Sequence, residues 1–167
     1  MNKKIKSLND LFLEELGDLY SAENQLIKAL PKMAEATTSD ELKSALEEHL
    51  EQTRGHANRL KEIFQDLGQK PMQVTCKAMK GLIEEGEEVV HKSEKCAARD
   101  AAIIGAAQRV EHYEIAGYGT AKCHASLLGH DRIEEILQET LDEERDADQR
   151  LNELAEGSIN SQAKQMA

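Results

Sequence analysis

The chain has 167 residues, of which 40% are hydrophobic and 32% charged, a composition that suits one domain with a compact core. Asp and Glu outnumber Lys and Arg by 32 to 21, which leaves a formal net charge of −11. An acidic surface repels phosphate groups, so we expect neither nucleic acid nor a membrane as partner. Only 2 prolines and 3% aromatic residues occur. This composition favours long helices over a β-sandwich or barrel, and we predict an all-α fold.

The sequence offers no candidate for a membrane-spanning or secretory segment. It contains no run of about 18 uncharged apolar residues, which a spanning helix would need. The N-terminal residues are basic, but acidic residues soon interrupt the stretch where the apolar core of a signal peptide would lie. The cysteines are widely spaced, without a Cys-x-x-Cys pair, which is typical of reduced thiols. We therefore expect a cytoplasmic protein.

Five helical segments are predicted, and they cover about residues 8–36, 40–67, 75–94, 98–128 and 131–156. Thr38 is the expected N-cap of the second segment, because its hydroxyl can form a capping box with the residue three positions on. Gly68 ends the second segment as a left-handed cap, and Gly129 follows the fourth. We assign residues 1–157 to one helical domain and expect 158–167 to form a flexible polar tail.

The four long segments carry residues at alternating spacings of three and four that form one stripe on each helix. Such stripes are typical of a left-handed four-helix bundle. Each stripe is apolar at its ends and polar in its middle, so the polar side chains should meet at one depth of the bundle. These side chains are Glu23 in the first long segment, His49 and His56 in the second, Glu111 and Glu114 in the third, and Glu144 and Asp148 in the fourth.

This predicted polar layer favours a metal site. Buried carboxylates are costly unless they are paired, protonated or bound to a metal ion. Lys and Arg are absent from the polar positions of the stripes, so a metal cation is the simplest partner for so many acids. Mixed carboxylate and imidazole ligands suit iron or manganese and could also accept zinc. The sequence leaves open whether one ion or two would bind.

The connection between the second and fourth segments covers about thirty residues, which is long enough to run the length of a bundle. Two helical hairpins joined by one long crossover form the ferritin-like arrangement. Here the crossover contains its own amphipathic helix. The apolar stripe of that helix must be buried on the bundle or on a second subunit, so we expect a homodimer.

Five stretches of the chain stand out as motifs: DLYSAENQLIKALPKM (18–33), EEHLEQT (47–53), AMKGLIEEGEE (78–88), VEHYEIAGYGT (110–120) and ETLDEERDADQRL (139–151). Together they resemble the YciE/YciF family of bacterial stress proteins, and its YciF branch most. The resemblance covers nearly the whole chain. It implies a ferritin-like helical fold, a cytoplasmic homodimer, a role in stress and kinship with di-iron proteins such as rubrerythrin. It implies no particular reaction.

The ferritin-like ligand pattern can be carried over to this chain position by position. The pattern has a Glu on each of two helices and a Glu-x-x-His motif on each of the other two. Glu23 matches the first Glu, and either Glu111 or Glu114 matches the second. His56 and Glu144 each match one half of a Glu-x-x-His motif.

Two ligands of that six-ligand pattern are missing from the chain. Thr53 stands where the second helix should have Glu, and Ala147 stands where the last helix should have His. His49, Asp148 or the spare member of the Glu111 and Glu114 pair could take their places. The incomplete pattern leaves a standard di-iron centre, and with it oxygen activation, as an open question.

Two functions follow from these residues. The first is a ferritin-like metal-binding stress protein, holding iron or manganese and, if redox-active, reducing peroxide or oxidising ferrous iron. The alternative is a non-enzymatic homodimer with a structural or interaction role, in which the polar layer is a vestigial metal site. In that case the histidines are buried groups satisfied by neighbouring acids. The last helix could also present a shifted face, which would place Glu144 and Asp148 toward solvent.

Overall fold

The computed structural model describes residues 4–71 and 74–165, and within these ranges it contains helices and no strand. The helices are α1 (Leu8–Ala36), α2 (Asp40–Asp66), α3 (Lys77–Lys92), α4 (Ala97–Leu127), α5 (Asp131–Leu154), the π-helical turn η1 (Ala155–Ile159) and α6 (Asn160–Lys164). The all-α prediction is confirmed, and the predicted order of the main helices matches. In the described part of the chain, no helix is both long and apolar enough to cross a membrane.

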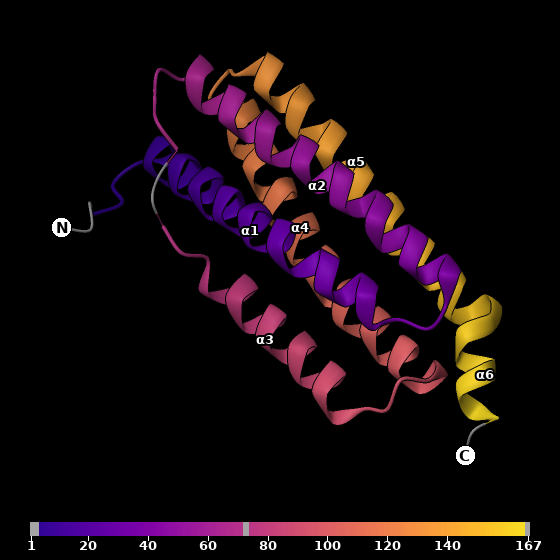
Figure 1. The fold of residues 1–167 in the computed structure, drawn as a ribbon. Helices are drawn as coiled ribbons and strands as arrows, with labels where there is room; N and C mark the ends of the chain where they lie inside the picture. Colours follow the sequence, from indigo (N-terminus) through magenta and orange to yellow (C-terminus); the bar gives the residue numbers. More distant parts are fainter. Residues whose placement is uncertain (1–3, 72–73, 166–167) are drawn as a thin grey trace.

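The four long helices form a bundle of two antiparallel hairpins (Figure 1). One hairpin is α1 and α2, the other is α4 and α5, and the two pack through α1 against α4 and α2 against α5. The crossover leaves the end of α2 and returns the chain to the opposite end of the bundle before α4 begins (Figure 1). Its helix α3 packs on the outside of α1 and α4. The ferritin-like topology with an extra crossover helix is therefore confirmed.

The bundle interior consists of two apolar cores with a polar layer between them. One core contains Phe12, Leu16 and Leu19 of α1, with apolar residues from α2, α4 and α5. The other contains Leu26 and Leu30 of α1, with apolar residues that include some from α3. On every long helix the polar residues lie in sequence between members of the two cores. The predicted apolar–polar–apolar order of the stripes is thus present in the bundle, and an apolar core lies at each end of the polar layer.

The turn between α1 and α2 differs from the prediction. The N-cap of α2 is Ser39, whose hydroxyl accepts a hydrogen bond from the Leu42 amide at 3.3 Å. Thr38 instead bonds to the buried carboxylate of Asp100 near the start of α4, through its amide at 2.8 Å and through its hydroxyl. A contact with a distant helix therefore takes the residue that the local capping pattern predicted as the cap. Asp100 fastens the α1–α2 turn to the second hairpin.

Helices α1 and α4 come especially close at Gly117. A Cβ atom added there would lie 2.8 Å from Leu19 Cδ2 and 3.3 Å from Glu15 Oε1. Leu19 is fully buried in the core and has little room to move aside. The absence of a side chain at Gly117 therefore sets the distance between these two helices just beside the polar layer.

The C-terminal end of the chain also differs from the prediction. We expected the last helix to end near Glu156 and a frayed tail to start at Ser158. Instead, the chain stays helical through η1 and α6 to Lys164. The reason is Ile159, which is only 1% exposed and belongs to the apolar core that includes Leu154. Burial of one apolar residue outweighs the tendency of Gly157 to end a helix.

Candidate metal centre

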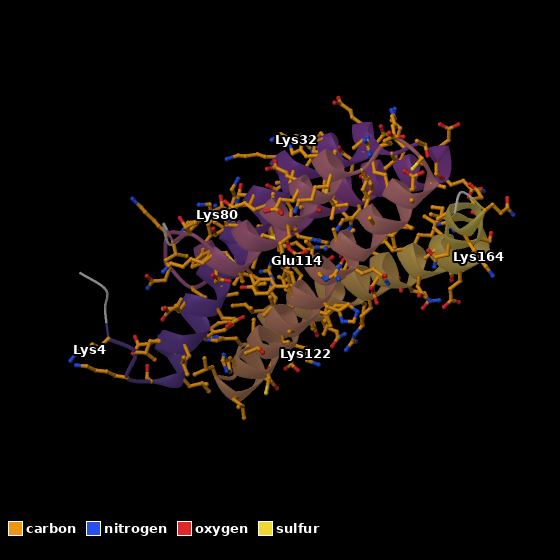
Figure 2. The ribbon with its side chains drawn as sticks, turned by 90° about the horizontal axis from the view of Figure 1, so that it is seen from below. Lys4, Lys32, Lys80, Glu114, Lys122 and Lys164 are labelled. Atoms are coloured by element: carbon orange, nitrogen blue, oxygen red, sulfur yellow. The ribbon has the colours of Figure 1, made fainter. Side chains whose placement is uncertain are left out.

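Six of the seven predicted ligands meet in the polar layer. They come from all four long helices and are buried: Glu23, His49, His56, Glu111, Glu114 and Glu144. Figure 2 shows the labelled Glu114 midway along the bundle, with the labelled lysines around its outside. The least buried member, His49, is 6% exposed. Carboxylate and imidazole groups are therefore gathered at one depth, as the stripes predicted.

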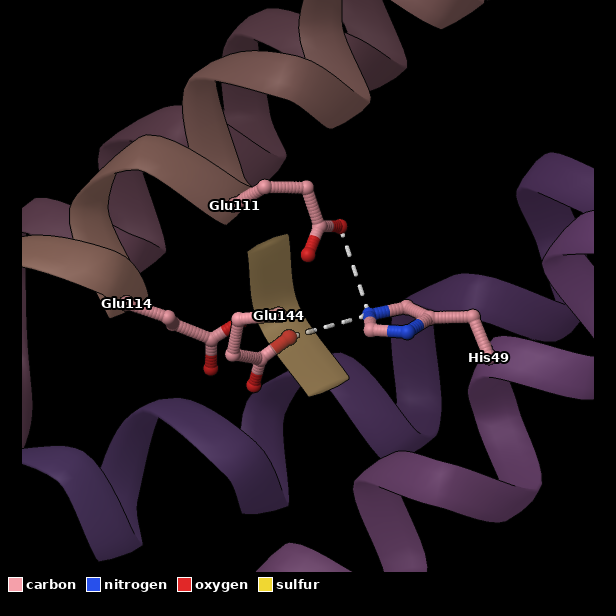
Figure 3. A group of neighbouring side chains, drawn as sticks. All are labelled: His49, Glu111, Glu114 and Glu144. Atoms are coloured by element: carbon pink, nitrogen blue, oxygen red, sulfur yellow. Dashed lines mark ion pairs between the residues drawn. The ribbon is translucent and has the colours of Figure 1, made fainter. Parts of the chain in front are cut away.

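The first group contains His49 of α2, Glu111 and Glu114 of α4, and Glu144 of α5 (Figure 3). His49 Nε2 lies 3.3 Å from Glu111 Oε1 and 3.9 Å from Glu144 Oε2. Each of the four residues offers one ligand atom, and these atoms lie within 4.8 Å of one another. A single cation placed among them could contact donors from three helices.

The second group contains Glu23 of α1, His56 of α2 and Glu144 of α5, again with ligand atoms within 4.8 Å of one another. His56 Nδ1 lies 2.9 Å from Glu144 Oε1 and 3.5 Å from Glu23 Oε1. Glu144 belongs to both groups. Its two oxygens face different histidines, with Oε1 toward His56 and Oε2 toward His49. Its carboxylate is therefore placed to bridge two neighbouring cations.

The other ring nitrogen of His56 has a partner that the sequence did not reveal. His56 Nε2 lies 2.8 Å from Glu143 Oε2, and Glu143 is in turn gripped by both terminal nitrogens of Arg59. The arginine and the histidine lower the pKa of Glu143, so this carboxylate remains ionised. An ionised Glu143 accepts a hydrogen bond from the Nε2–H group of His56, and Nδ1 faces Glu23 and Glu144. No spacing rule singles out Glu143 among the acids of its helix.

Asp148 lies outside the cluster, which corrects the expectation that it would join the ligands. Its carboxylate accepts a hydrogen bond from Gln108 Nε2 at 3.1 Å and pairs with the exposed His112 at 3.3 Å. Asp148 follows Glu144 by four residues, so it points about 40° further round the helix. That rotation moves it from the stripe to the edge of the α4–α5 interface.

The two positions that lack the ferritin-like ligands are filled in different ways. Thr53 is fully buried, and its hydroxyl donates to the carbonyl oxygen of His49 at 2.8 Å, so it does not serve as a ligand. Ala147 brings no donor atom at all. His49, four residues before Thr53, and Glu111, three residues before Glu114, supply ligand atoms to the first group. Of the substitutes that the sequence suggested, these two lie in the cluster.

Many polar atoms of the cluster have no hydrogen-bond partner. They are Glu23 Oε2, Glu111 Oε2, Glu144 Oε2 and both oxygens of Glu114. Other buried atoms pair only within the cluster, His56 Nδ1 with Glu144 Oε1 and His49 Nε2 with Glu111 Oε1. Buried polar atoms almost always have partners, because leaving one unpaired costs about 1–3 kcal/mol. Tyr118 satisfies only one atom, by donating its hydroxyl to Glu23 Oε1. These unpaired atoms lie close together, and their lone pairs could coordinate a cation.

The protonation of the cluster reflects the same crowding. Burial raises the pKa of Glu114 well above its ordinary value, and the neighbouring Glu23, Glu144 and Glu111 raise it further. Burial acts to lower the pKa of His49, but Glu111 and Glu144 raise it to about 9. Without a cation, the cluster therefore holds extra protons on its imidazoles and on Glu114. A bound cation would replace those protons.

Comparison with known proteins places the chain in a family. Residues 7–164 match the family described as a domain of unknown function, DUF892. The chain is 44% identical to Protein YciF of Escherichia coli strain K12 over 164 residues, which are 98% of this chain and 99% of that protein.

Solved structures agree with this assignment. The crystal structure of the E. coli stress protein YciF superposes with a TM-score of 0.90 at 44% identity, covering 93% of this chain and 99% of the other. YcfI from Rhodopseudomonas palustris, named as a candidate structural protein, gives a TM-score of 0.88 at 45% identity and covers 91% and 97% of the two chains. The predicted resemblance to the YciF branch is confirmed. The chain thus belongs to the DUF892 family, as a relative of YciF.

Proposed function

We propose that the polar layer binds two metal ions at neighbouring positions that share Glu144. The first position is formed by His49, Glu111, Glu114 and Glu144, and the second by Glu23, His56 and Glu144. The observation that carries this proposal is the set of buried ligand atoms that have no hydrogen-bond partner or pair only within the cluster. Two divalent ions would also balance the charge of the four ionised carboxylates when both histidines are neutral.

The residues around His56 support a ligand role for that histidine. A histidine that binds a metal through one nitrogen usually donates its other N–H to a carboxylate. Glu143 takes that part, and Arg59 holds Glu143 in place. With Nε2–H bonded to Glu143, the nitrogen of His56 left to bind a cation is Nδ1, which faces Glu23 and Glu144.

The donor set favours iron or manganese, with zinc as a further possibility. A redox-active ion at this position would supply electron transfer to peroxide or from ferrous iron. The chain's own contribution is to hold the ligands, in a layer that apolar cores close at both ends. Tyr118 contributes by hydrogen bonding Glu23 and orienting that carboxylate.

Metal analysis tests the proposal. The protein is expressed without a His-tag in medium supplemented with iron or manganese, and its metal content is measured after gel filtration. We expect up to about two ions per chain in the wild type, fewer in Glu23→Ala and Glu111→Ala, and an unchanged content in the surface variant Glu135→Gln. A wild-type protein that holds no metal under either condition would refute the proposal.

A second candidate function is a non-enzymatic structural or interaction role. The absence of ligands at Thr53 and Ala147 favours it, as does the name given to the relative from R. palustris. In this case the imidazoles and acids of the layer pair through protons alone. Metal-free wild type would then keep its full thermal stability, and added iron or manganese would leave its melting temperature unchanged.

We also propose that the protein acts in the cytoplasm under stress and as a homodimer. The stress role comes from the name of its relative, the E. coli stress protein YciF. The dimer is supported by α3, where Leu82, Ile83, Val89 and Val90 are only partly buried. Light scattering coupled to gel filtration tests the dimer, and the mass of a single chain at micromolar concentration would contradict it.

A further inference from the structure

A cavity of about 450 Å³ opens between α2 and α5 and reaches the metal cluster. Its inner wall includes His49 and Glu111, both more than nine-tenths buried. Glu111 Oε2 has no hydrogen-bond partner, and His49 Nε2 contacts only Glu111 and Glu144 of the cluster. The rest of the wall consists of Ala45, Leu46, Glu48 and Gln52 of α2 and Asp146, Ala147, Arg150 and Leu151 of α5. The cavity therefore connects the molecular surface with two residues of the cluster, His49 and Glu111.

The small side chain of Ala147 helps to keep this space open. Ala147 lies three residues after Glu144, at the position where the ferritin-like pattern has a histidine. A histidine there would bring an imidazole ring into the space that the alanine leaves. His49 supplies a donor from the opposite wall instead, with its Nε2 toward the cluster and its Nδ1 3.3 Å from Gln52 Oε1. Ala147 thus leaves a passage at the position where the ferritin-like pattern has a ligand.

The charges along the passage favour cations. Glu48 and Asp146 are exposed on the two sides of its mouth, and Glu111 lies at its inner end. The cation at the mouth, Arg150, has an acidic partner of its own in Glu153 at 3.8 Å. Between the acids the wall is apolar, with Leu46 and Leu151 both buried. Acidic groups set in such low-dielectric walls focus the field and raise the local concentration of cations.

We propose that this cavity is the port through which divalent cations reach the buried cluster. The proposal rests on the metal-binding function and adds the route. A cation would be attracted by Glu48 and Asp146, pass Ala147 and meet His49 and Glu111 as its first ligands. The imidazole and carboxyl protons displaced by the ion would leave by the same path.

The loading rate of Co²⁺ tests the port, because bound Co²⁺ absorbs visible light and can be followed by stopped flow. Ala147→Leu fills the passage without removing a ligand, and we expect it to slow loading by about tenfold or more while the final Co²⁺ content stays at the wild-type level. Ala116→Leu adds the same side chain on the exposed surface of α4 and should load at the wild-type rate. Equal rates for Ala147→Leu and wild type would overturn the port.

A second pair of variants tests the charges and cannot fail through core packing. Glu48→Gln combined with Asp146→Asn should slow loading by about threefold to tenfold and weaken its dependence on salt. Glu85→Gln combined with Glu135→Gln changes the net charge equally at exposed positions outside the cavity. If both pairs slow loading equally, only overall charge matters and the acidic mouth is refuted.

These outcomes separate the route from the function. A wild type that takes up no Co²⁺ at equilibrium overturns both the metal site and the port. A wild type that binds Co²⁺ with a rate insensitive to Ala147→Leu and to the mouth charges overturns the port alone. Slow loading in the cavity variants, with full final content, supports both.

Discussion

Replacing Glu114 by Gln should stabilise the metal-free protein and weaken its response to metal. Glu114 is fully buried, and neither carboxylate oxygen has a hydrogen-bond partner. Because burial and neighbouring acids raise its pKa well above 4.5, the folded protein holds a proton on Glu114 at a pH where the unfolded chain releases it. The distance between pH 7 and the ordinary pKa limits the cost of this protonation to about 3 kcal/mol.

Gln has the shape of a protonated Glu and carries no such cost. Glu114→Gln should therefore raise the melting temperature in EDTA at pH 7, by up to about 6–12 °C, since 1 kcal/mol corresponds to about 2–4 °C in a domain of this size. The difference should disappear below the ordinary pKa of Glu, where the unfolded chain is protonated as well.

Metal should narrow the difference in melting temperature between the two proteins. An ion present at about 100 times its Kd adds about 2.7 kcal/mol to the wild type, but Glu114→Gln has lost a ligand and should gain less. Circular-dichroism melts of both proteins in EDTA and in Mn²⁺ measure the four values, with exposed Glu135→Gln as the control. A Glu114→Gln protein that melts at or below the wild-type temperature in EDTA at pH 7 would refute the reasoning.

Three further predictions concern the surroundings of the site. Glu143→Ala removes the acceptor of His56 Nε2 and should weaken metal binding by about 10–100-fold in an equilibrium titration; unchanged affinity would contradict the positioning role. In EDTA, the unfolding free energy should fall as pH rises from 6.5 to 9. The folded state keeps protons on His49 and His56, whose pKa values are about 9 and about 11, and the unfolded chain releases them. His49 alone accounts for about 3 kcal/mol of this loss, and urea titrations that show a rise would be inconsistent with it. Gly117→Ala should cost about 1–3 kcal/mol of unfolding free energy, because the new methyl group meets buried Leu19; wild-type stability would show that α1 and α4 can separate freely.

The polar layer could be predicted because its residues interrupt otherwise apolar stripes. Glu23 lies between Leu19 and Leu26, and His49 and His56 lie between Leu46 and Leu60, which the structure buries in the two cores. A helix that buries both ends of a stripe also buries its middle. The periodicity of single helices therefore fixed the depth of the ligands without knowledge of which helices are neighbours.

Other parts of the site depend on details that periodicity does not contain. Asp148 fits the spacing but lies at the edge of the stripe, where Gln108 and His112 offer it better partners. Glu143 lies one residue from Glu144 and about 100° round the helix, so only the facing Arg59 and His56 make it part of the site. Such partners appear only when the relative rotation of packed helices is known.

The C-terminal end gives the same lesson for local signals. Gly157 and the polar residues after it indicated the end of a helix. However, Ile159 is buried in the core, and the chain stays helical. Thr38 likewise matched a capping pattern, but its hydroxyl donates a hydrogen bond to Asp100 instead. In both cases a long-range contact outweighed a local preference of about 1 kcal/mol.

The most direct test of the metal centre is an anomalous difference map from crystals of iron-loaded protein. Our account predicts two peaks inside the bundle on either side of Glu144, one among His49, Glu111 and Glu114 and the other between Glu23 and His56. A map without any peak in this layer, from crystals whose iron content has been raised by soaking, would contradict the metal-binding function.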